Sequence, residues 1–158
     1  MELFTLARVL HVLAVILWIG GVAMVTTVII PSVKRLKSKE EQLETFERIE
    51  GRFALQAKIT TLITGLSGFY MLWYLDAWDR YLQLSFWWIH AMTLIWIVFT
   101  LILYVFEPWL LHRIFREQVM RDPGKAFSVI HKLHWILLTL SLITTAGVVA
   151  GCHGWYWF

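Results

Sequence analysis

Two histidines lie inside long apolar stretches of this 158-residue chain. His11 is part of ARVLHVLAVILWIGG (residues 7–21), and His90 is part of FWWIHAMTL (residues 86–94). An unpaired ionisable group is costly at membrane depth, so polar side chains found there are functional by default. Imidazole is a common ligand of iron, copper and zinc, which makes a metal or haem the first chemistry to consider.

The segments that carry these histidines are long enough to cross a bilayer. Hydrophobic residues make up 59% of the chain and charged residues only 16%, a balance typical of integral membrane proteins. A membrane helix needs ~20 apolar residues, and four segments meet this requirement, at about residues 3–33, 53–75, 84–111 and 126–157. We therefore predict an all-α integral membrane protein, with residues 1–158 forming one four-helix transmembrane bundle.

The distribution of positive charge predicts the topology. Lysine and arginine gather in residues 34–52 and 113–125, whereas the segment between the second and third predicted helices holds only Arg80. The positive-inside rule places both basic segments in the cytoplasm and both termini outside, as in a multi-pass protein of a bacterial-type inner (plasma) membrane. The basic residues are accounted for by topology, so we expect no nucleic-acid partner.

The segment KRLKSKEEQLETFERIEGR (residues 34–52) is charged but has apolar residues at helical spacing. It predicts a short amphipathic cytoplasmic segment, either a helix on the membrane surface or a solvated extension of the second membrane helix. The first apolar stretch lacks a basic leader and an Ala-x-Ala site, so we interpret it as a retained helix.

Depth in the membrane brings the two histidines to one level. In this topology His11 lies about 8 residues, or ~12 Å, inside the outer surface, and His90 about 6 residues, or ~9 Å. Two imidazoles at one depth on different helices are the arrangement that a bis-histidine haem b requires. The alternatives are a structural hydrogen bond to a Thr, a Ser or a carbonyl, and a proton relay.

Neighbouring residues fit a haem but have simpler explanations. Arg8 lies one turn outward of His11, where a haem propionate would point, or it extends to the interface as a snorkelling charge. Gly20 and Gly21 would let a flat ring approach the first helix, or only pack helices. Gly147 and Gly151 form a Gly-x-x-x-Gly pattern that could pair two copies into a homodimer.

A second histidine group lies towards the cytoplasmic end. His112 ends the third predicted helix, and His131 and His134 share a face of the fourth. Together they could ligate a second haem or a metal ion, or they could simply meet water and lipid headgroups. Glu107 in the same region needs a partner, for which we expect an Arg or a His, and its role is either structural pairing or proton handling. The single cysteine, Cys152, excludes an internal disulfide and a Cys-pair metal site.

The sequence also resembles a known family at several short motifs. Leu10-His11 followed by Trp18-Ile19-Gly20 resembles the first helix of HemJ-type protoporphyrinogen oxidases and of related CopD-like membrane proteins. Similar elements follow in the same order, namely Glu47-Arg48 before the second helix and Trp88-Ile89-His90 at the start of the third. The similarity covers most of the chain.

This resemblance implies a small bundle that binds haem b. For the oxidases it implies oxidation of protoporphyrinogen IX, with electrons passed to quinone. The oxidases carry a lysine two residues after the third-helix histidine, where this chain has Met92, a difference that weakens the case for that substrate.

Three functions follow from the sequence. The first is a b-type cytochrome that holds one haem or two and exchanges electrons with quinone or a small redox partner. The second is a HemJ-like porphyrinogen oxidase, and the third is a CopD-like protein that handles or transports copper. No residue can be assigned a catalytic role, so enzymatic activity stays open.

Overall fold

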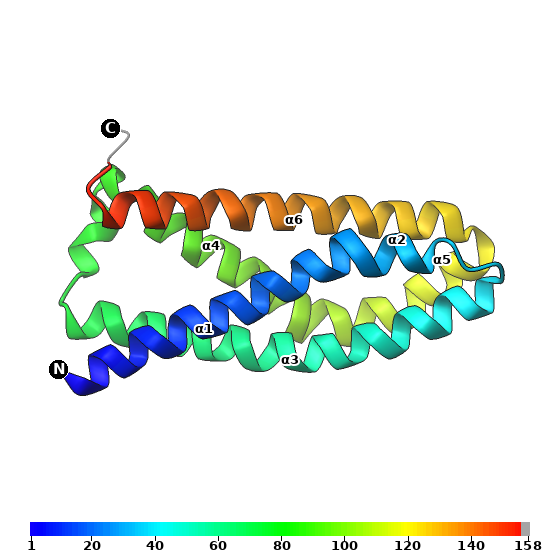
Figure 1. The fold of residues 1–158 in the computed structure, drawn as a ribbon, viewed down its shortest axis with the longest axis horizontal. Coiled ribbons are helices and arrows are strands. Elements are labelled where there is room, and N and C mark those ends of the chain that lie inside the picture. The colour runs from blue at the N-terminus through cyan, green and yellow to red at the C-terminus, as the bar shows by residue number, and fades with distance from the viewer. Residues whose placement is uncertain (156–158) are drawn as a thin grey trace.

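The computed structural model describes residues 1–155, with the side chains of residues 108–112 excepted, and this part of the chain is helical with no strand. The described residues form four long helical stretches, which run along one axis and are joined by short connections (Figure 1). The N-terminus, the end of the last helix and the α3–α4 connection lie together at one end of the molecule. We call this the terminal end, and the opposite end, which holds the α2–α3 and α5–α6 connections, the basic end.

The helices have the following bounds. The first stretch consists of α1 (Glu2–Met24), a π-helical turn η1 (Val25–Ile29) and α2 (Ile30–Val33). The second is α3 (Lys39–Tyr74), followed by the short 3-10 turns η2 (Trp78–Leu82) and η3 (Leu84–Phe86). The third consists of α4 (Trp87–Leu101), the π-helical η4 (Ile102–Phe115) and α5 (Arg116–Arg121), and the fourth is α6 (Pro123–Cys152).

The predicted amphipathic segment is not a separate helix. The Ser38 side chain caps α3 by accepting a hydrogen bond from the Glu41 backbone N–H at 3.0 Å, and acidic residues in the first turn favour a helix start there. From this cap α3 continues for 36 residues into the apolar region. The charged segment is thus mainly the first part of α3, which is one of the two alternatives that the sequence left open.

In the part of the chain that the structure describes, three helices are long and apolar enough to cross a membrane, namely Glu2–Val33, Leu84–Glu107 and Pro123–Cys152. Their outward faces carry large apolar side chains, including Leu13, Ile16 and Leu17, each more than half exposed. The chain is therefore an all-helical, membrane-associated protein. The apolar part of α3 contains Lys58 and several threonines and glycines, which reduce its mean hydropathy, so the fourth span remains a prediction.

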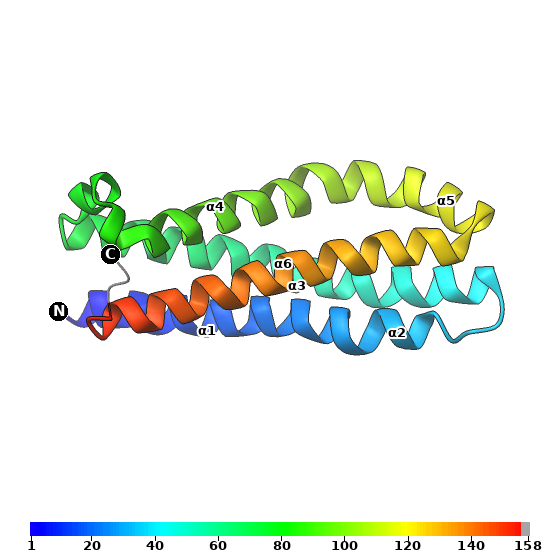
Figure 2. The same ribbon diagram turned by 90° about the horizontal axis from the view of Figure 1, so that it is seen from above.

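The helices pack in a fixed order around the bundle. α1 packs mainly along α3, and α4 packs mainly along α6, with α1–α6 and α3–α4 contacts completing the arrangement (Figure 2). At the basic end the rings of Phe46, Phe115 and Phe127 contact one another, with centroids 5.3 to 5.5 Å apart. In the middle, Trp18 of α1 meets Phe99 of α4 edge to face at 4.8 Å.

Aromatic rings fill the space above several helix glycines. A Cβ at Gly65 would lie 2.5 Å from the Trp96 ring, and one at Gly147 would lie 2.4 Å from Trp87. Gly151 meets Trp88 in the same way. The Gly-x-x-x-Gly face of α6 is thus covered by tryptophans of the same chain. A homodimer through this face would require their displacement.

Candidate functional site

His11 points into the bundle. It lies on the same face of α1 as the buried residues Ala7, Ala14 and Trp18, at the spacing of successive helical turns. Its Nδ1 lies 3.0 Å from the Thr64 carbonyl oxygen and 3.1 Å from the Ser67 hydroxyl, both on α3. A Cβ at Gly68 would lie 3.2 Å from the His11 ring, so the absence of a side chain there admits the imidazole.

These contacts determine which ring nitrogen is available. A carbonyl oxygen can only accept, so Nδ1 carries the proton and donates it to Thr64. Nε2 is then the basic nitrogen, and among the described residues it has no hydrogen-bond partner. A histidine that binds a metal through one nitrogen while donating from the other to a carbonyl has this arrangement.

His90 occupies a different environment. It is exposed, and its Nε2 lies 2.9 Å from the Tyr81 carbonyl oxygen. The Tyr81 ring packs edge to face against the imidazole at 5.3 Å. The buried side of α4 includes Trp88 and Phe99, and His90 lies about 200° around the helix from Trp88. The ring therefore points away from the bundle core.

The structure thus places His11 and His90 towards one end of the molecule without joining them. His11 bonds to α3, whereas His90 bonds to the turn before its own helix. Neither depth nor spacing in the sequence could show that the two rings leave their helices in different directions. For the two rings to face each other across a macrocycle, the hydrogen bond between His90 and the Tyr81 carbonyl would have to break. The His90 side chain would then have to rotate towards the bundle core.

Arg8, Gly20 and Gly21, which were also predicted at this site, make contacts unrelated to His90 or have open space around them. Arg8 is exposed, and its guanidinium lies over the Phe4 ring at 4.7 Å, a cation–π contact at the terminal end. Gly20 faces open space, whereas Gly21 packs closely against the Phe53 ring of α3. Gly21 therefore serves helix packing here.

His131 and His134, two members of the second histidine group, form hydrogen bonds to different parts of the structure. His131 Nε2 lies 2.9 Å from the Thr26 carbonyl oxygen and 3.1 Å from the Trp135 indole nitrogen. His134 donates from Nδ1 to the Ile130 carbonyl of its own helix at 3.0 Å. The side chain of His112 lies outside the described residues. A second haem or metal at these three histidines stays a prediction.

A cavity of about 80 Å³ lies between the helices near the middle of the bundle. Most of its lining is apolar, but the carboxylates of Glu50 and Glu107 and the ring of His134 also reach it. Trp18 forms part of the wall. Its side chain is 3% exposed, and its indole N–H has no partner among the described residues. We call this space the central cavity.

An ion pair stands beside the central cavity. Lys58 Nζ lies 2.5 Å from Glu107 Oε2, which joins α3 to η4. The Tyr104 hydroxyl donates to the Lys58 backbone carbonyl at 2.9 Å and holds the same two elements together. Our expectation of an Arg or a His as the partner of Glu107 was wrong. Lys58 was missed because it lies within a predicted membrane span, although a cation at that depth already signalled the need for a buried carboxylate.

Glu50 is the second carboxylate of the central cavity. It precedes the apolar part of α3, and burial raises its pKa to about 7, with a further increase from the negative charge of Glu107. Lys58 acts in the opposite direction, and Glu47 adds a smaller increase. Sequence reasoning treated Glu50 as one of many surface charges. Its position at helical spacing from the buried Phe46 and Ala54 was the available signal.

Comparison of the chain with protein-family models, curated proteins and solved structures found no match.

Proposed function

We propose that this chain is a haem b-binding membrane protein that transfers electrons, with four membrane spans and both termini outside a bacterial-type inner membrane. The observation that carries the proposal is the His11 ring. It is directed into the bundle, it donates from Nδ1 to the Thr64 carbonyl, and its Nε2 is unpartnered among the described residues. That nitrogen is the axial ligand in this proposal.

The surroundings of His11 support an oriented ligand. Ser67 contacts the same nitrogen that donates to Thr64, so two groups of α3 fix the ring. Such outer hydrogen bonds orient a metal-bound imidazole and increase its basicity. When bound, haem supplies one-electron chemistry, and its axial ligands tune the reduction potential.

His90 meets the requirement for a second ligand only in part. It lies near the start of α4, at the terminal end from which α1 also begins (Figure 1). In this conformation, however, its Nε2 is bonded to Tyr81. We therefore assign the first ligand to His11, and propose His90 as the second ligand after rotation of its ring. Quinone or a small redox protein is the proposed electron partner.

An absorption spectrum of the purified protein, expressed with added haem precursor, tests this function. We expect a Soret band, and a sharp α-band after reduction. His11→Ala should abolish haem binding, while His153→Ala provides a matched control because His153 bonds only within its own helix turn, to Val149. A colourless wild-type protein overturns the function, and a full haem spectrum in His11→Ala overturns the ligand.

A further inference from the structure

The central cavity combines groups that the packing of apolar helix faces does not need for stability. Two carboxylates, Glu50 and Glu107, approach one lysine, Lys58, across a space that is otherwise lined by apolar side chains. Lys58 pairs directly with Glu107. Glu50 therefore forms no ion pair among the described residues. If Glu50 were ionised, its negative charge would add to that of Glu107 without a second positive charge to compensate it.

The wall of the central cavity supplies a second, independent sign of a polar occupant. Trp18 is almost fully buried, yet its indole N–H has no acceptor in the described part of the chain. Buried N–H groups are nearly always bonded to protein or to ordered water. A volume of about 80 Å³ has room for one or more water molecules, since a single water needs only ~10–15 Å³ of such space.

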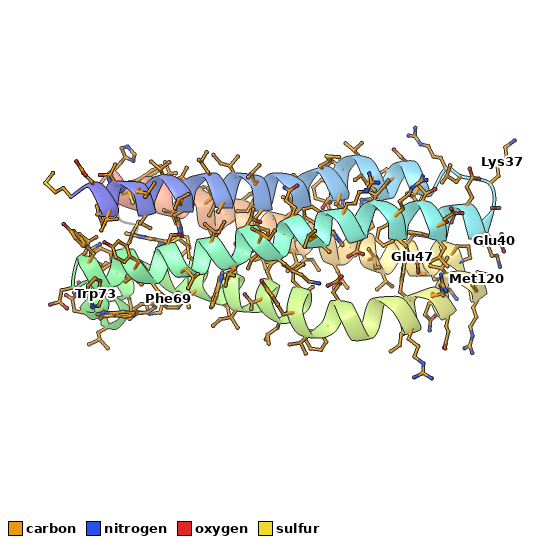
Figure 3. The ribbon with its side chains drawn as sticks, turned by 90° about the horizontal axis from the view of Figure 1, so that it is seen from below. Lys37, Glu40, Glu47, Phe69, Trp73 and Met120 are labelled. Atoms are coloured by element: carbon orange, nitrogen blue, oxygen red, sulfur yellow. The ribbon has the colours of Figure 1, made fainter. Side chains whose placement is uncertain are left out.

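Further carboxylates lie on α3 between the central cavity and the basic end. Glu40, Glu44 and Glu47 line a surface groove of about 320 Å³ together with Arg116 of α5. Figure 3 shows Glu40 and Glu47 on α3 towards the basic end, with Met120 of α5 nearby. Glu47 Oε2 bonds to Arg116 at 3.1 Å, whereas its Oε1 is buried and unpartnered among the described residues. Glu50 is the next carboxylate along the helix, three residues further inward.

We propose that the central cavity is an internal proton-binding site, in which Glu50 takes up one proton from the aqueous phase at the basic end by way of Glu47. The proton moves from water to the Glu50 carboxylate, and the reverse step returns it to water. The site takes a proton and bound water, and it does not depend on haem.

The charges around Glu50 determine when the proton binds. On its own helix, Glu47 disfavours and Lys58 favours the ionised form, and Glu107 of η4 disfavours it. His134 of α6 lines the same cavity, with His131 one turn away, and the cavity wall from α1 has no titratable residue among those described. Because Lys58 is paired with Glu107, the summed charge of Lys58, Glu107 and Glu50 is zero when Glu50 is protonated. In this proposal the Glu50 carboxylate therefore binds its proton below neutral pH and releases it above neutral pH.

Infrared difference spectroscopy of the purified protein in detergent tests the site. The carbonyl stretch of a protonated carboxylic acid should appear as pH is lowered through about 7, with the amplitude of one group per chain. Glu50→Gln should remove that band. Glu117→Gln is the matched control because Glu117 is an exposed carboxylate of α5 that lines neither the groove nor the central cavity, and it should leave the band unchanged.

Two further variants test the roles of Trp18 and Glu47 in the proposed site. Trp18→Phe removes the indole N–H while keeping an aromatic ring, and should shift the frequency of the Glu50 band by removing a donor to the cavity water. Glu47→Gln should leave the band but slow hydrogen–deuterium exchange at Glu50 at least tenfold. A band that persists in Glu50→Gln, or no titrating band in the wild type, overturns the proposal. Either result leaves the haem spectrum, and hence the proposed function, to be judged separately.

Discussion

Lys58 of α3 and Glu107 of η4 form an ion pair 2.5 Å long, and Glu107 is almost completely buried. The pair joins two helical stretches that contact each other less extensively than α1 and α3 do. Removing one partner of a buried pair leaves an uncompensated charge, which costs more than the pair itself contributes.

We therefore expect Lys58→Met to destabilise the protein by about 3 kcal/mol, with Glu107→Gln having a smaller effect because the Lys58 side chain that it leaves unpaired is 29% exposed and can be solvated. The double substitution Lys58→Met/Glu107→Leu should recover most of the loss, since neither charge of the pair is then left without its partner. Thermal unfolding in detergent micelles measures all three. Equal stability of Lys58→Met and wild type would contradict the structural role of the pair.

The raised pKa of Glu50 predicts a pH dependence of stability. The unfolded chain releases the Glu50 proton near its ordinary pKa of 4.5, whereas the folded protein retains it up to about 7. Between these two pH values the folded state binds more protons than the unfolded state does. The free energy of unfolding therefore falls as pH rises from about 4.5 to about 7, and then levels off. The loss should be on the order of 1–3 kcal/mol.

Glu50→Gln should lack this contribution and gain stability relative to wild type above pH 7. Denaturation midpoints of both proteins, measured over a series of pH values, check the prediction. Parallel pH profiles for the two proteins would show that Glu50 ionises normally. Glu117→Gln, a substitution at an exposed carboxylate, again provides the control.

Replacing a glycine of α3 by alanine should destabilise the protein only where an aromatic ring covers that glycine. At Gly65 a Cβ would lie 2.5 Å from Trp96, whose indole N–H donates to the Thr61 carbonyl at 2.9 Å and so cannot move freely. We expect Gly65→Ala to cost about 1–3 kcal/mol through overpacking. Gly51 is on the same helix with open space around it, so Gly51→Ala should instead stabilise by up to ~1 kcal/mol. Thermal unfolding distinguishes the two, and similar effects at both positions would contradict this packing.

The helical architecture was predictable from the sequence because long apolar runs admit few alternatives. The order of the four long stretches and their connections were predicted, and the continuity of residues 39–52 with α3 was one of two alternatives that the sequence left open. That continuity depends on the packing of Phe46 against Phe115 and Phe127, which local charge patterns do not reveal.

The candidate site was predictable only at the level of residue type. His11 was identified from its polarity within an apolar helix, but its partners on α3 depend on the register between two helices. Glu50 was missed because its neighbours along the chain are surface charges. Its burial arises from α1, η4 and α6, which contribute the cavity wall at Trp18, Glu107 and His134.

The number of membrane spans can be decided with cysteine labelling. Cys152 is the only cysteine of the chain and is exposed at the end of α6. Leu3 is exposed at the start of α1, at the same terminal end of the bundle (Figure 1). Four spans place both positions on one side of the membrane, whereas three spans place them on opposite sides.

We expect a membrane-impermeant maleimide, added outside intact spheroplasts, to label native Cys152 and also Leu3→Cys in a Cys152→Ser background. Ser38→Cys in the same background is the control for the basic end, and it should react only after the membrane is permeabilised. Labelling of Cys152 together with Ser38→Cys from outside would contradict the positive-inside assignment. Labelling of only one terminus would mean that α3, whose apolar part contains Lys58, does not cross the bilayer.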